Sequence, residues 1–164
     1  MSYQEKRTIV SIISGLLVLV AYCIYVFGKY QSHTVALDDL KFSATTMLIF
    51  IGIGIAATII IQILFHIALS VGIAARERNH DEKAIEKEIE YPFVEDEMDK
   101  LIELKAMKIG FIIGGAGFIA ALVTVVFNCS VAVMLNIIFL SFSLGSLAEG
   151  ILSLHYYRKG VRNG

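Results

Sequence analysis

The chain is divided by three long stretches in which every position is uncharged. Residues 8–28, 42–75 and 109–148 contain no Asp, Glu, Lys or Arg over 21, 34 and 40 residues respectively. An α-helix needs about 20 mainly apolar residues to cross the roughly 30 Å of hydrocarbon in a bilayer. The first two stretches therefore predict one transmembrane helix each, and the third is long enough for two.

The third stretch has one polar interruption, Asn128-Cys129-Ser130, which predicts a tight turn between two helices. Residues 74–106 form the only sizeable segment outside the predicted spans, which we place at residues 8–28, 43–73, 107–127 and 131–157. The predicted fold is all-α: a single integral membrane domain over residues 1–164, built as a four-helix bundle. A short cytoplasmic helical hairpin is expected between the second and third spans.

Composition and charge support this class and predict its orientation. Hydrophobic residues make up 57% of the chain, against about 45–50% in a soluble domain. Twelve of the fourteen Lys and Arg residues lie near the termini or between the second and third spans, and only Lys29 and Lys41 lie on the opposite side. Because cytoplasmic loops carry the excess of Lys and Arg, both termini are predicted to be cytoplasmic.

The segment between the second and third spans is acidic, with eleven acidic and five basic residues from Glu77 to Lys105. Residues 81–91 have the spacing of a surface helix, and Pro92 is expected to end it. Carboxylates then return at the start of a second predicted helix that continues into the third span; they are Glu95, Asp96, Glu97 and Asp99. These carboxylates either dock a basic partner protein or belong to a solvated hairpin that joins two spans.

One short motif in this segment resembles a known family. The run Asp96-Glu97-Met98-Asp99-x-x-Ile102-x-x-Lys105-Ala106 leads directly into an apolar span. It resembles the entry to a transmembrane helix in the DUF2178-like family, which groups small four-span membrane proteins of unknown function from bacteria and archaea. Met98 stands where that family usually has arginine. The resemblance implies a location in the plasma membrane and no particular activity.

Small residues in two of the spans predict close helix packing. Lipid is as apolar as leucine, so helices in a membrane associate where small side chains let their backbones approach. The third span has Gly110, Gly114 and Gly117 at such spacing, and the second has Gly52. These glycines indicate packing within one bundle or a dimer interface, and we favour the first.

Two ionisable residues inside the predicted spans are candidates for a functional site, because such residues are costly in hydrocarbon. Glu149 and His66 lie nine and ten residues before the basic residues that end their spans, which predicts a similar depth. Gln62 lies one turn from His66, and Ser146 lies three residues before Glu149. This polar layer could fix helix register, or bind a proton, a cation or a small ligand. A metal or catalytic site is a third interpretation, although one Glu and one His supply fewer ligands than zinc requires.

One further polar residue, Asn136, is expected to hydrogen-bond across helices in the fourth span. We find no catalytic, nucleotide-binding or metal-binding motif in the chain. The leading hypothesis is therefore a small non-enzymatic membrane protein, a sensor, accessory or regulatory subunit that acts through protein–protein contacts. The alternative is a small dimeric transporter or channel that uses the layer of Glu149 and His66, and a membrane enzyme is third. Expected partners are the lipid bilayer and a second copy or another membrane or cytoplasmic protein, with no cofactor, metal or nucleic acid.

Overall fold

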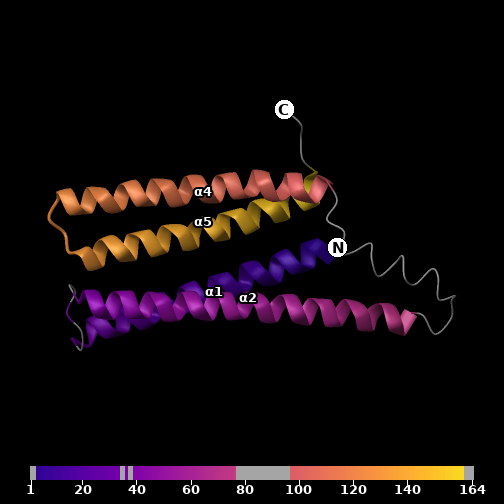
Figure 1. The fold of residues 1–164 in the computed structure, drawn as a ribbon, viewed down its shortest axis with the longest axis horizontal. Helices are drawn as coiled ribbons and strands as arrows, with labels where there is room; N and C mark the ends of the chain where they lie inside the picture. The colour runs from indigo at the N-terminus through magenta and orange to yellow at the C-terminus, as the bar shows by residue number, and fades with distance from the viewer. Residues whose placement is uncertain (1–2, 34–35, 37–38, 77–96, 161–164) are drawn as a thin grey trace.

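The computed structural model describes residues 3–33, 36, 39–76 and 97–160, and these residues form four long α-helices (Figure 1). The helices, in chain order, are α1 (Tyr3–Gln31), α2 (Leu40–Arg76), α4 (Glu97–Val126) and α5 (Val131–Lys159). All four are long and apolar enough to cross a membrane. The prediction of an all-α, multi-pass membrane protein with four helices packed as a bundle is confirmed.

The helices are longer than the predicted spans. The predicted helix that starts among the carboxylates and continues into the third span is α4, which begins at Glu97 and runs without interruption to Val126. The absence of charge marks the part of a helix that lies in hydrocarbon, but Glu and Lys are also good helix formers and carry the helix beyond it. The helix predicted over residues 81–91 lies outside the described residues.

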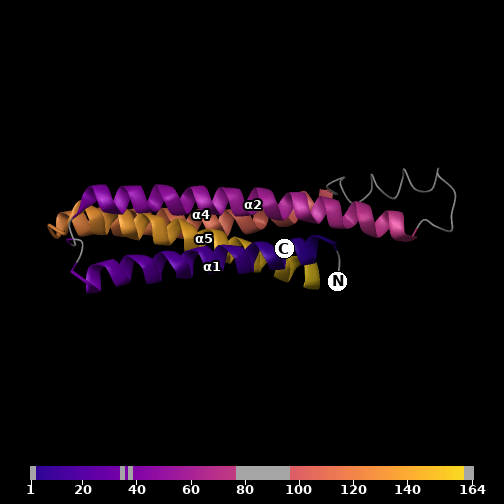
Figure 2. The ribbon, with the colours of Figure 1, turned by 90° about the horizontal axis from the view of Figure 1, so that it is seen from below.

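The four helices run antiparallel to their chain neighbours, so the bundle has two distinct ends (Figure 1). We call the end that holds Tyr3, Glu97 and Lys159 the terminal end. The other end, here called the turn end, holds the connection between α1 and α2 and the short turn between α4 and α5. Helix α5 is central, because it packs against each of the other three helices (Figure 2).

Helices α4 and α5 form the closest pair. The buried positions of α4 recur every three or four residues and are mostly small; they are Ile102, Ala106, Gly110, Gly114, Gly117 and Ala121. A Cβ atom added at Gly145 of α5 would lie only 2.6 Å from the Gly110 carbonyl oxygen. The two backbones are thus in direct contact, as small residues at helix crossings in membranes allow.

The turn between α4 and α5 lies at the predicted polar interruption. Asn128 has a φ of 55°, in the left-handed region that asparagine tolerates better than most residues. Ser130 then caps α5, because its side chain accepts a hydrogen bond from the backbone N–H of Val133.

An aromatic cluster joins α1, α2 and α5 toward the turn end. Tyr22 is only 2% exposed and packs with Val26 and Met47, and its ring meets Phe139 at a centroid distance of 4.3 Å. The Tyr22 hydroxyl donates a hydrogen bond of 2.6 Å to Oδ1 of Asn136. The prediction that Asn136 bonds across helices is confirmed.

The contact between Gly110 and Gly145 predicts a specific effect of substitution. Gly145→Ala would push a methyl group into a backbone carbonyl, which no rotation of a side chain can relieve, so we expect a loss of about 1–3 kcal/mol of stability. The measurement is the free energy of unfolding in mixed detergent micelles. Gly115→Ala is the control, since open space surrounds that position. Equal stability of the two variants would contradict a direct backbone contact.

Candidate functional site

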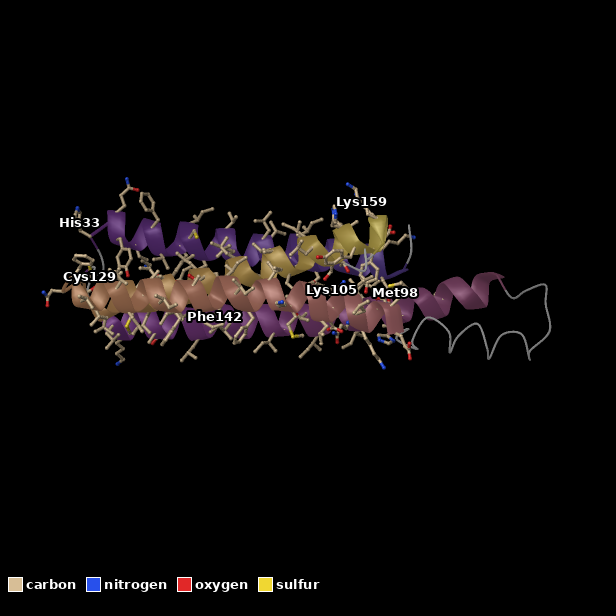
Figure 3. The ribbon with its side chains drawn as sticks, turned by 90° about the horizontal axis from the view of Figure 1, so that it is seen from above. His33, Met98, Lys105, Cys129, Phe142 and Lys159 are labelled. Carbon is tan, nitrogen blue, oxygen red and sulfur yellow. The ribbon has the colours of Figure 1, made fainter. Side chains whose placement is uncertain are left out.

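A polar pocket of about 240 Å³ lies at the terminal end of the bundle, between α1, α4 and α5. Its walls combine charged groups, hydroxyl groups and one amide, from Gln4, Arg7, Thr8, Ser11, Asp99, Glu103, Ser146, Glu149, Gly150, Ser153 and Tyr157. Figure 3 labels Met98, Lys105 and Lys159 at this end, and His33 and Cys129 at the other.

Helical periodicity explains why each helix contributes several residues to the pocket. On α1 the polar positions are 4, 7, 8 and 11, and on α5 the lining positions are 146, 149, 150, 153 and 157. Residues spaced by three or four positions share one face of a helix. Asp99 and Glu103, four residues apart, complete the pocket from the first turns of α4.

The pocket holds one guanidinium group, Arg7, and three carboxyl groups. The Tyr157 hydroxyl donates a hydrogen bond to Asp99. Glu103 lies within electrostatic range of both Glu149 and Tyr157. With Arg7 and the three carboxyl groups all charged, the pocket carries an excess of negative charge.

The carboxyl groups are spread along the pocket instead of converging on one point. Among the described residues, no three His, Cys, Asp or Glu side chains come together in a way that could hold a metal ion. Asp99 lies in the first turn of α4, whereas Glu149 follows the charge-free stretch 109–148 directly and packs against Gly110. Negative groups thus line the pocket from its outer end to its innermost part.

Glu149 owes its position to a glycine on the neighbouring helix. A Cβ atom at Gly110 would lie 3.0 Å from Oε2 of Glu149, so the carboxyl group occupies the space that a side chain at 110 would fill. Gly145, one turn earlier on α5, is the residue that meets the Gly110 backbone. The helix crossing therefore also positions the innermost acid of the pocket.

The structure brings some of the predicted site residues together and separates others. Glu149 and Ser146 share the polar pocket, whereas Gln62 and His66 lie on the exposed surface of α2 and do not line it. Counting residues along a helix predicts a similar depth for His66 and Glu149, but it does not predict which helices are neighbours. The neighbours of Glu149 in the pocket come from α1 and α4. The functional layer formed by Glu149 and His66 stays a prediction.

Of the residues predicted to pack helices or to dock a partner, the structure places some at a contact and others elsewhere. Gly110, Gly114 and Gly117 are buried on the α4 face that meets α5, whereas open space surrounds Gly52 on α2. A partner role for the acidic residues at the start of α4 stays a prediction: Asp99 lines the pocket, Glu97 is exposed beside it, and Glu95 and Asp96 lie outside the described residues.

Reasoning from sequence missed Arg7, Glu103 and Tyr157 as members of the site. The available signal was the polar periodicity of residues 4–11, which puts four polar side chains on one face of α1. That face had to meet polar groups or water, because polar groups are costly against lipid.

A second, larger cavity adjoins the pocket. This apolar crevice of about 740 Å³ lies between α1, α2 and α5, and its walls include Leu19, Phe50 and Phe142. Ser11, Ser146 and Gly150 line both the crevice and the polar pocket, so the two spaces meet at these residues. Together they form an apolar space with a charged end.

Comparison with family models, with curated proteins and with solved structures found no match to this chain. The resemblance carried by residues 96–106 therefore stays a prediction.

The charge balance of the pocket predicts a coupling between Arg7 and Glu149. Arg7→Gln would remove the one guanidinium from a pocket that three carboxyl groups also line, so the variant should be less stable at neutral pH. Adding Glu149→Gln should recover part of that loss, with a coupling energy of about 0.5–1 kcal/mol. The measurement is a double-mutant cycle on thermal unfolding in detergent.

Lys159→Gln serves as the control for this cycle, because Lys159 is exposed at the end of α5 and does not line the pocket. It should show no coupling to Glu149→Gln. If Glu149→Gln changes stability equally with and without Arg7, the two groups do not interact and the proposed charge balance is wrong.

Proposed function

We propose that this chain is a small non-enzymatic protein of the plasma membrane, a sensor, accessory or regulatory subunit that acts through contacts with other proteins. The observation that carries the proposal is the position of the polar pocket, at the terminal end where the acidic segment of the chain joins the bundle. The polar pocket is thus adjacent to the point where the acidic segment leaves the bundle.

Helix α4 supplies the physical connection between the two. It begins at Glu97, contributes Asp99 and Glu103 to the pocket, and continues to Val126 against α5. A continuous helix moves as a rigid element, so a ligand that shifts Glu103 would also shift the start of α4. Occupancy of the pocket could in this way be transmitted to a partner bound to the acidic segment.

The proposal includes an orientation in which the terminal end faces the cytoplasm. Among the described residues, Lys6, Arg7, Lys100, Arg158 and Lys159 lie at this end, and Lys29 and Lys41 lie at the turn end. Lys and Arg accumulate on the cytoplasmic side of membrane proteins. The turn between α4 and α5 then faces the outside.

The two native cysteines allow this orientation to be tested. Cys129 is exposed in the turn between α4 and α5, whereas Cys23 lies within the apolar part of α1. A maleimide reacts with thiolate, which does not form in hydrocarbon. A membrane-impermeant maleimide should therefore label intact cells through Cys129, and Cys129→Ser should abolish the labelling.

Lys159→Cys in the Cys129→Ser background is the matched control, since it moves the thiol to the opposite end of the bundle. It should react only after the cells are permeabilised. If this variant is labelled in intact cells and Cys129 is not, the terminal end faces the outside and the proposed orientation is wrong.

The proposed function is tested by isolating the native complex in mild detergent. We expect the wild-type chain, of 18.1 kDa, to purify in a complex heavier than one chain, with subunits identified by mass spectrometry. Replacing Glu95, Asp96 and Glu97 together by Gln should weaken or abolish that complex, because these acidic residues are the proposed contact with a basic partner.

The control removes charge from the opposite end of the bundle, by changing Lys29 and Lys41 to Gln, and should leave the complex intact. A wild-type chain that purifies alone, or a complex that survives neutralisation of the acidic residues, would contradict action through this segment.

A further inference from the structure

We infer that the apolar crevice and the polar pocket together bind one amphiphilic cation, a long-chain amine that enters from the surrounding bilayer. This inference rests on the proposed sensor function and names the chemical class of the ligand. Three features carry it: the size of the crevice, its junction with the pocket, and the balance of charges in the pocket.

The crevice has the dimensions of a binding site for an apolar chain. Its volume of about 740 Å³ falls within the roughly 300–1,000 Å³ typical of ligand pockets. Along α5 it extends from Leu135 to Gly150, which is about 22 Å of helix. An alkyl chain lying in it would run along the bundle, within the part of the protein surrounded by hydrocarbon.

The junction between the two cavities sets where a head group would lie. Ser11 and Ser146 line both spaces, so a chain in the crevice leads past two hydroxyl groups into the polar pocket. Glu149 lies one turn beyond Ser146 and is the deepest acid of the pocket, with its carboxyl group beside Gly110. An acid thus lies one turn from the junction on α5, and Arg7 lies one turn from Ser11 on α1.

The remaining charges favour a cation over an anion or a neutral head. Beyond Glu149 the pocket adds Glu103 and Asp99, against the single cation Arg7. A positive head group beside Glu149 would offset part of this negative excess in a region of low dielectric, where the attraction between charges is strong. A sulfate head would face three carboxyl groups, and a hydroxyl head would leave their repulsion unchanged.

The test measures binding of dodecylammonium to the purified full chain in phosphatidylcholine nanodiscs. Equilibrium dialysis compares discs with and without protein, so that partition into lipid is subtracted. Wild-type discs should bind dodecylammonium in excess of empty discs, and should bind dodecanol and dodecyl sulfate at least about tenfold more weakly.

Two variants test the two ends of the ligand separately. Glu149→Gln removes the charge without changing shape, and Gly54→Leu fills the crevice at a position that has open space. Each should weaken binding of dodecylammonium by about tenfold. The matched controls are Asp39→Asn, at the turn end, and Gly52→Leu; both alter residues outside the pocket and the crevice, and the variants should bind as the wild type does.

Circular dichroism verifies that each variant is folded. If Gly54→Leu does not fold, Thr58→Leu takes its place, since Thr58 also lines the crevice. The inference is overturned if wild-type discs bind no more dodecylammonium than empty discs, if dodecyl sulfate binds equally well, or if both variants bind as the wild type does. These measurements need no partner protein. Failure of the amine to bind is thus distinguishable from failure of the native complex to form.

Discussion

The direct contact between the backbones of α4 and α5 at Gly110 and Gly145 is the constraint on which the rest of the structure depends. Helices in lipid gain little from burying apolar side chains, because the surrounding hydrocarbon is equally apolar. Close approach therefore has to come from small residues, and α4 provides them along one face. The same crossing leaves room for the carboxyl group of Glu149. Packing and the candidate site thus share one geometric origin.

The other two helices, α1 and α2, pack on the α5 side of the pair formed by α4 and α5. Helix α5 uses one face for α4 and another for α1 and α2, and the aromatic cluster around Tyr22 closes the bundle toward the turn end. The apolar crevice remains between α1, α2 and α5. The bundle is therefore closed by aromatic rings on one side of the crevice and by charged and hydroxyl groups on the other.

The sequence predicted those features that depend on one helix at a time. Length without charge gave four helices, and the polar interruption at 128–130 gave the position of the turn, because both are local properties. The partners of Glu149 could not be found in this way. Depth is predicted by counting residues along a helix. Neighbours depend on which faces meet, and Gln62 and His66 are exposed on α2 and do not line the pocket that Arg7 lines. The polar face of α1 was visible in the spacing of residues 4–11, but its counterpart on α4 required the tertiary structure.

The hydrogen bond between Tyr22 and Asn136 joins residues separated by 114 positions in the chain. Helix α1 leaves the ribosome long before α5 exists, so during synthesis Tyr22 must wait in the membrane, or at its translocation machinery, until α5 arrives. Without α5, the described helices α1, α2 and α4 lack the one helix that contacts all three of them. The bundle is therefore assembled only after α5 has been synthesised, and the crevice between α1, α2 and α5 takes shape at that step.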